Sequence, residues 1–267
     1  AIAAATNHGL RIEMVPDGFG AMGGCQSVIG FGRKLVASRW FSTVWFIDEI
    51  EKDLAAMHTD TSGTTQFQHK AILTFTQRHR IPALLLLGQA GSGKTLFARS
   101  IAGEAGVPLA EMNLGGLKGQ HVGDTEQNTQ RALETLIALS QGRLLLIATC
   151  NDIGALERSP ELLRRFKLPK FYFDLPTAEE RAVIWPISAK RHGVGCSPDL
   201  KPDDTDWTGS EIDACCETAG RLSIPVRDAA TWTLPMALTS GAMVERRRQQ
   251  ADGNYLSASW PGVYKRD

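Results

Sequence analysis

The sequence predicts an α/β fold, in which helices cover both faces of a parallel sheet, followed by a small α-helical unit. Two observations carry this prediction. Up to Pro176, short apolar runs of strand length alternate with stretches of helical spacing. After Pro176 the pattern is helical only. We therefore expect an α/β domain over residues 1–176, an α-helical domain over 177–240 and a C-terminal tail over 241–267 of the 267-residue chain.

The expected elements follow in chain order. Residues 1–39 are expected to be loop-rich, because "VPDGFGAMGG" contains four glycines and a proline. "STVWFIDEI" is typical of a buried strand that runs into a helix, and "HKAILTFTQRH" has helical spacing. The remaining apolar runs predict strands over 81–88, 107–114, 143–151 and 170–176, with helices over 94–106 and 125–140.

Three helical stretches follow Pro176. "TAEERAVIWPISAKRHG" opens with Thr177 and Glu180 in the spacing of a capping box. "TGSEIDACCETAGRL" and "VRDAATWTLPMAL" come next, and together they predict the small helical domain. The tail is polar, and its aromatic residues look exposed in "YLSASWPGVY"; the pattern does not say whether they pack on this chain or on a neighbour.

Composition narrows the function classes. Lys+Arg and Asp+Glu are both 29, which argues weakly against a general nucleic-acid coat. The five cysteines are scattered without a C-x-x-C pair, so we expect them to be reduced and to form neither a disulfide framework nor a zinc site. The aliphatic run Ala83–Leu87 is far shorter than the ~20 residues of a spanning helix. With no charged leader at its start, the sequence predicts a cytoplasmic protein without a membrane segment.

A phosphate-binding loop is the strongest motif. "GQAGSGKT" matches G-x-x-x-x-G-K-[ST] and lies between a predicted strand and a predicted helix. Its glycines let backbone N–H groups face phosphates, and the helix start adds partial positive charge. Lys94 is expected to reach the terminal phosphates of ATP, and the Thr95 hydroxyl to ligate Mg²⁺. The nucleotide-binding residues expected here are Gly88, Gln89, Ala90, Gly91, Ser92, Gly93, Lys94, Thr95 and Leu96.

A second acidic motif supports an ATP site. "VWFIDEIEKD" is an apolar run that ends in Asp48 and Glu49, although the same acids could start a solvated helix. Beside a phosphate loop, Asp48 is expected near Mg²⁺, and Glu49 is expected to orient and deprotonate the attacking water.

These motifs together resemble the AAA family of ATPases, in the AAA+ class, and above all its stand-alone members with one module. The resemblance runs to about residue 230. "VWFIDEIEK" resembles the family's Walker B strand, "LLLIATCND" its sensor-1 strand and "SPELLRRF" its arginine-finger segment. "DWTGSEID" resembles the lid motif, and "AMGGCQSV" the N-terminal Gly-Gly segment.

The resemblance implies roles for particular residues. Asn151 would lie near the γ-phosphate, or it simply caps a turn. Arg165, with Arg164 as the second choice, would act on the ATP of a neighbouring subunit; both could instead be surface charges. The adenine pocket would include Gly23, Gly209 and Ser210. The family also implies ATP and Mg²⁺ as ligands and a homo-oligomer, specifically a hexameric ring.

Three departures from the family pattern stand out. The Walker B segment, roughly residues 42–79, is displaced ahead of the phosphate loop, and moving it behind Ser140 would restore the family order. Either the chain is permuted, or the native order differs; the short link after Ser140 favours the second explanation. At the pore-loop position His121 replaces an aromatic residue, which argues against threading of polypeptides. The second finger position holds no arginine, only Lys167 and Lys170 nearby.

Four functions are compatible with the sequence. The leading hypothesis is an ATP-hydrolysing ring that remodels a protein partner. A nucleic-acid loader or motor is the second, suggested by the basic run in "ERRRQQ", Glu245–Gln250, but a solvated helix face explains that run as well. A nucleotide kinase and a non-hydrolysing nucleotide switch are the others.

Overall fold

An eight-stranded sheet forms the centre of the computed structural model, which describes residues 5–7, 9–52, 55, 63–119, 122–195 and 201–266. Within these residues the strand order is β1-β2-β5-β3-β6-β4-β7-β8. β1 and β2 are antiparallel to their neighbours, and the pairs from β5 to β8 are parallel. The strands are β1 (Ala5–Asn7), β2 (Leu10–Met14), β3 (Thr43–Ile47), β4 (Ala83–Gly88), β5 (Pro108–Met112), β6 (Leu144–Cys150), β7 (Lys170–Phe173) and β8 (Leu256–Ser257).

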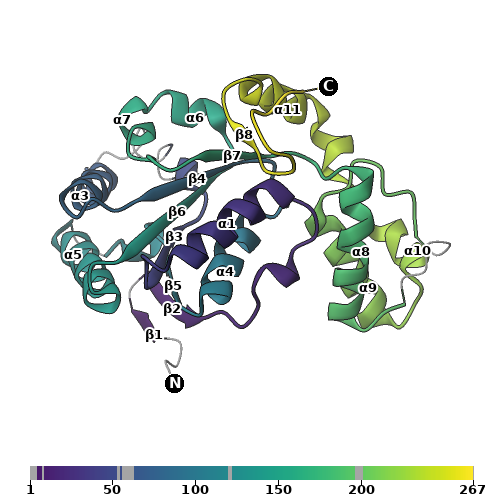
Figure 1. Ribbon diagram of the computed structural model, residues 1–267, viewed down its shortest axis with the longest axis horizontal. Coiled ribbons are helices and arrows are strands. Elements are labelled where there is room, and N and C mark those ends of the chain that lie inside the picture. The colour runs from purple at the N-terminus through teal and green to yellow at the C-terminus, as the bar shows by residue number, and fades with distance from the viewer. Residues whose placement is uncertain are drawn as a thin grey trace.

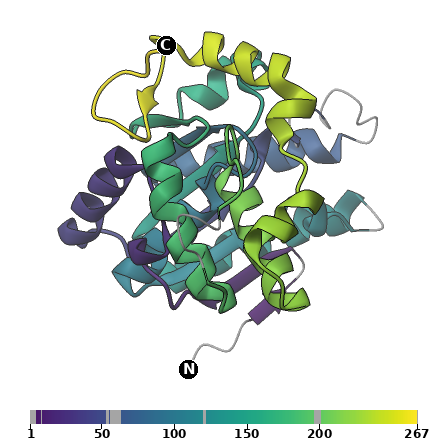
Figure 2. The ribbon, with the colours of Figure 1, turned by 90° about the vertical axis from the view of Figure 1, so that its right-hand side faces the viewer.

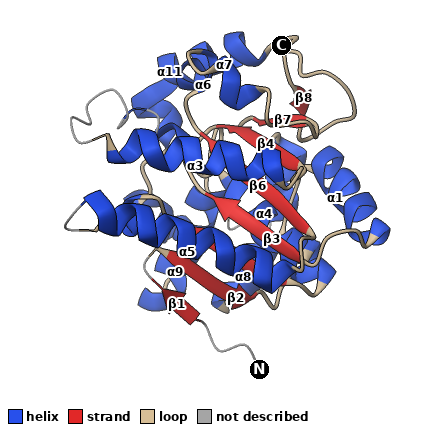
Figure 3. Ribbon diagram, turned by 90° about the vertical axis from the view of Figure 1, so that its left-hand side faces the viewer, coloured by secondary structure: helices blue, strands red, loops and turns tan. Residues whose placement is uncertain are grey.

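Helices cover both faces of this sheet, which confirms the predicted α/β class (Figures 1 and 3). α1 (Gln26–Ser38) and α4 (Lys94–Ala105) pack on one face, where a buried cluster includes Phe97 and Ile101. α3 (Thr64–Arg78) and α5 (Val122–Ser140) lie side by side on the other face. The central strands β3, β4 and β6 are buried along their whole length, which explains their unbroken apolar runs.

β3 lies inside the sheet despite its early place in the sequence. It pairs in parallel with β5 on one side and with β6 on the other. The chain therefore crosses over β3 between β5 and β6, and α5 covers that crossing. The link Gln141–Arg143 is long enough, because the Arg143 carbonyl accepts a hydrogen bond from the Ser42 amide at the start of β3. The sequence as printed is thus compatible with a complete sheet, and the short link does not exclude it.

The segment after Pro176 forms a separate helical unit, which faces the viewer in Figure 2. It consists of α8 (Ala178–His192), α9 (Gly209–Leu222) and α10 (Val226–Ala229) around a cluster that includes Trp185 and Trp207. The predicted capping box of Thr177 and Glu180 is present at the start of α8. Asp204 accepts hydrogen bonds from the Trp185 indole at 2.7 Å and from Arg181 at 3.0 Å, which ties the unit together.

Both ends of the chain are more ordered than the sequence predicted. Residues 1–39 were expected to be loop-rich, but they include β2 at the sheet edge and helix α1. The tail was expected to be polar with exposed aromatics, and Trp260 is indeed 38% exposed, but the tail also contains β8, which pairs with β7 of the same chain and follows helix α11 (Met236–Ala251). Tyr264 is 1% exposed and stacks edge-on against Tyr172. Two short helices, α6 (Ile153–Glu157) and α7 (Pro160–Leu163), lie between β6 and β7.

None of the helices in the described residues is both long and apolar enough to cross a membrane.

Candidate nucleotide site

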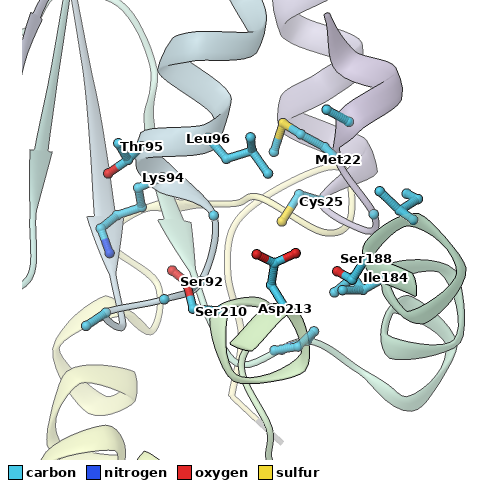
Figure 4. A pocket seen from close by; sticks show the side chains of 18 of the residues that line it. Met22, Cys25, Ser92, Lys94, Thr95, Leu96, Ile184, Ser188, Ser210 and Asp213 are labelled. Carbon is cyan, nitrogen blue, oxygen red and sulfur yellow. The ribbon is translucent and has the colours of Figure 1, made fainter. Parts of the chain in front are cut away.

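A cavity of about 530 Å³ lies where the carboxyl ends of the parallel strands meet the helical unit (Figure 4). Segments from distant parts of the sequence form its walls: the N-terminal glycine segment, the end of β3, the phosphate loop, the end of β6 and helices α8 and α9. The cavity collects most of the residues that the sequence suggested, namely Gly23, Asp48, Glu49, Ala90, Gly91, Ser92, Gly93, Lys94, Thr95, Leu96, Asn151, Gly209 and Ser210.

The phosphate loop connects β4 to α4 in the predicted manner. Gly91 and Gly93 have φ values of +73° and +101°, a backbone conformation in which a side chain would be strained. The Lys94 ammonium is buried and donates hydrogen bonds to the carbonyls of Gly88 and Gln89. Burial lowers the pKa of Lys94 to about 8, and the nearby carboxylates of Glu51 and Asp48 oppose this shift. Lys94 is therefore held against its own loop.

The acidic end of β3 lies directly beside this loop. Both carboxylate oxygens of Asp48 lie 3.2 Å from the Thr95 hydroxyl at the start of α4. Glu49 has a left-handed backbone with φ of +51°, which is uncommon for a residue with a side chain and is often found at functional sites. Its carboxylate accepts a hydrogen bond of 2.9 Å from the Asn151 amide and also pairs with Lys52. The acidic end of β3 and the end of β6, about a hundred positions apart in the sequence, thus meet at one edge of the sheet.

Two further polar residues support these acids, and the sequence reasoning did not single them out. The Thr149 hydroxyl donates to Asp48 and accepts from the Glu49 backbone N–H at 2.8 Å. Glu51 is 8% exposed and accepts a hydrogen bond of 3.0 Å from the Asn151 backbone N–H. A threonine inside the apolar run of β6 was the available signal, since a polar side chain in a buried strand needs a hydrogen-bond partner.

The other end of the cavity is mostly apolar. Met22, Leu96 and Ile184 line it, and Figure 4 shows them converging from the N-terminal segment, α4 and α8. The backbone of Gly23 lies so close to α8 that a Cβ there would stand 2.7 Å from the Ile184 side chain. The Glu180 carboxylate of α8 also accepts a hydrogen bond of 2.7 Å from the Cys25 backbone N–H. Apolar walls around a few fixed polar groups are typical of a small-molecule site.

A charged group faces this apolar end from α9. Asp213 points into the cavity in Figure 4 and is paired with the Arg191 guanidinium at 2.7 Å. His192 lies 3.2 Å from the same carboxylate. Because the Arg191 guanidinium holds Asp213, the negative charge of this carboxylate is partly offset within the cavity. The sequence reasoning did not single out this cluster, which mixes one residue of α9 with two of α8.

Some predicted residues lie elsewhere. Gly88 and Gln89 do not line the cavity, because the Gln89 side chain is fully buried on the far side of the loop. Gly88, with φ of +135°, leaves no room for a Cβ, which would stand 2.0 Å from the Phe173 carbonyl oxygen. Arg164 and Arg165 follow α7 and do not reach this cavity. The predicted pore-loop residue His121 lies outside the described residues.

The residues present fit a magnesium ion. Mg²⁺ prefers oxygen ligands and keeps several waters, so one or two protein oxygens suffice. The Thr95 hydroxyl and the Asp48 carboxylate supply such oxygens next to the phosphate loop. These two residues are the ones that would hold the ion together with the phosphates of a nucleotide.

Comparison with known proteins agrees with this geometry. Residues 84–147, from β4 into β6, match the family described as "ATPase family associated with various cellular activities (AAA)". This segment of the chain is AAA-like. The sheet and its covering helices form an α/β fold, and the matched segment is the part of this fold that is similar to the AAA family. The matched segment includes the phosphate loop but not Asp48 or Glu49, so it does not address the displaced Walker B segment.

Individual relatives are distant. An uncharacterized AAA domain-containing protein, ycf46, of Guillardia theta is 26% identical over 148 residues, covering 40% of this chain and 29% of that protein. The ATPase family gene 2 protein homolog B of Rattus norvegicus is 37% identical over 84 residues, covering 29% of this chain and 11% of that protein. The chain thus spans less than a third of either relative. The crystal structure of the FIGL-1 AAA domain aligns with a TM-score of 0.40 at 14% identity, covering 71% of this chain and 85% of that one.

Proposed function

We propose that this chain is an ATPase that binds ATP with Mg²⁺ in the cavity and hydrolyses it, as a ring of identical subunits that remodels a protein partner. One observation carries the proposal: Glu49, held by Asn151, lies beside the Asp48–Thr95 pair at the phosphate loop. A base, a water-positioning amide and two metal-ligating oxygens in one place are the parts that hydrolysis of a phosphoanhydride requires. The AAA-family match over the phosphate loop supports the same class of activity.

Each residue then has a task. Thr95 and Asp48 would hold Mg²⁺, which would neutralise charge on the phosphates. Lys94 leaves the carbonyls of Gly88 and Gln89 to bind the terminal phosphates. Glu49 accepts the proton of the attacking water, while Asn151 keeps its carboxylate in place. Gly23, Gly209 and Ser210 border the space for the base and sugar.

The ring is part of the proposal because Arg165 lies outside its own cavity. Arg165 is partly buried, and its Nε atom has no hydrogen-bond partner in the described part of the chain. In the proposed ring this arginine, or Arg164 beside it, stabilises the phosphate charge in the cavity of the adjacent subunit. ATP turnover should therefore increase with protein concentration.

The contacts of the basic run weaken the nucleic-acid hypothesis that this run suggested, because two of its three arginines have partners within the chain. Within "ERRRQQ", Arg247 donates to Gln89 and Arg248 pairs with Asp174 at 2.9 Å. Arg246 is exposed, and a single exposed arginine is a small basic surface.

Steady-state hydrolysis of ATP at several protein concentrations tests the proposal, with Glu49→Gln and a control, Glu134→Gln, at an exposed acid of α5. The unaltered chain and the control should turn ATP over, and Glu49→Gln should bind ATP but lose hydrolysis by about 100-fold or more. ATP binding without turnover by the unaltered chain would favour the switch hypothesis. Phosphate transfer to a nucleoside rather than to water would favour a kinase.

A further inference from the structure

The side chain of Gln89, the second residue of the phosphate loop, is fully buried and reaches away from the cavity. Its amide nitrogen donates to the Tyr172 hydroxyl at 3.3 Å and to the Val244 carbonyl at 3.4 Å. Its amide oxygen accepts a hydrogen bond of 2.5 Å from the Arg247 guanidinium. A loop residue is therefore anchored to α11, a helix about 155 positions later in the chain.

The peptide groups of Gln89 control the shape of the loop. Its backbone N–H donates to the Phe173 carbonyl at 3.2 Å. Its carbonyl accepts from three donors: the Ser92 backbone N–H, the Ser92 hydroxyl and the Lys94 ammonium. Because one carbonyl holds both Ser92 and Lys94, a rotation of the Gln89 peptide would displace both of these cavity-lining residues.

Helix α11 is kinked at Ser240, and each of its two parts is held by its own contacts, so the part that carries Arg247 can serve as a support. Near its C-terminal end, Arg248 pairs with Asp174 at 2.9 Å, and the Tyr264 hydroxyl donates to the same carboxylate at 2.6 Å. At its N-terminal end, the Met236 backbone N–H donates to Glu211 of α9 at 2.6 Å. α11 thus connects the helical unit to the back of the phosphate loop.

We propose that Arg247 is a positioning residue for the phosphate loop. By holding the Gln89 side chain against α11, it fixes the Gln89 peptide and thereby the resting positions of Ser92 and Lys94. This inference rests on the proposed nucleotide site. It gives one residue of the basic run, Arg247, an indirect part in phosphate binding, although Arg247 does not line the cavity.

A double-mutant cycle tests the inference. The dissociation constants of ATP, ADP and adenosine are measured for the unaltered chain, Arg247→Met, Gln89→Leu and the double variant, with Arg246→Met as the exposed control next to Arg247. Because Arg247→Met removes a charge-assisted hydrogen bond, it should weaken the binding of ATP and of ADP by about tenfold. Adenosine should bind as before, because only the phosphate end is disturbed. The double variant should bind ATP no more weakly than the poorer single variant.

Three results would overturn the inference: multiplicative effects of the two substitutions, an equal loss of adenosine binding, or an equal loss in Arg246→Met. Thermal unfolding of each variant identifies any that fail to fold. In that case Arg247→Lys, which keeps the charge and one donor, replaces Arg247→Met, and it should lose less ATP affinity than Gln89→Leu. If the unaltered chain binds no ATP, the proposed function fails; if it binds ATP and Arg247→Met binds it equally well, only the inference fails.

Discussion

Acidification is expected to destabilise this fold through His69, a buried histidine on α3. His69 is 5% exposed, and its Nε2 atom has no hydrogen-bond partner in the described part of the chain. Burial lowers its pKa from 6.5 to about 4, because the charged imidazolium would lose its hydration. At a pH between about 4 and 6.5, His69 is therefore protonated in the unfolded chain but mostly neutral in the folded chain.

The sign and the size of the effect follow from this shift. Above about pH 6.5 the imidazole is neutral in both states, and its contribution to stability is fully present. Between about pH 6.5 and 4 the unfolded state binds more protons, so the free energy of unfolding decreases as the pH falls. Below about pH 4 both states are protonated and the loss is complete. A shift from 6.5 to about 4 corresponds to a loss of about 3 kcal/mol from this one residue.

Urea unfolding at several pH values between about 7.5 and 4 measures this loss. The His69→Gln variant has no titratable group at position 69, so its stability should fall less steeply with decreasing pH than that of the unaltered chain. The difference between the two proteins should change by about 3 kcal/mol across the range. His79→Gln, at the exposed end of the same helix, is the control and should follow the unaltered chain. Parallel curves for the unaltered chain and His69→Gln would refute the reasoning.

Two other substitutions test the site and the loop. Thr149→Val keeps the side-chain shape but removes the hydrogen bonds to Asp48 and to the Glu49 backbone. The kcat for ATP hydrolysis should fall by about tenfold or more, while the affinity for ATP should change by less than about threefold. An unchanged kcat would contradict this role of Thr149. Gly88→Ala would place a Cβ 2.0 Å from the Phe173 carbonyl oxygen, so thermal unfolding should show a loss of about 2 kcal/mol or more. Gly30→Ala, at an open position within α1, is the matched control and should be stabilising by about 0.5–1 kcal/mol.

The sequence predicted the parts of this fold that local patterns encode. The apolar runs of β3, β4 and β6 are unbroken because these strands are buried on both faces. The capping box at Thr177 and Glu180 is a local signal, and the structure confirms it. The strand β2 was missed, because "LRIEM" is short and borders glycine-rich sequence that is typical of loops.

The parts that the sequence did not predict depend on contacts between distant segments. Nothing near Gln89 indicates that its side chain faces Arg247, since only the complete fold brings α11 beside the phosphate loop. The pairing of Asp213 with Arg191 likewise depends on how α8 and α9 cross. By contrast, the acidic end of β3 could be associated with the phosphate loop from residue types alone, because the carboxyl ends of parallel strands share one edge.

The position of β3 has a consequence for synthesis of the chain on the ribosome. Val44 pairs with Leu109 on one side and with Leu145 on the other, so in a chain synthesised in the printed order β3 leaves the ribosome long before either neighbouring strand. At about 5–20 residues per second, the hundred residues to β6 take on the order of 5–20 s. During that time "TVWFI" is an apolar segment without either of its strand partners, and such segments favour aggregation. A nascent chain with this segment order is therefore expected to be most prone to aggregation before β6 has emerged.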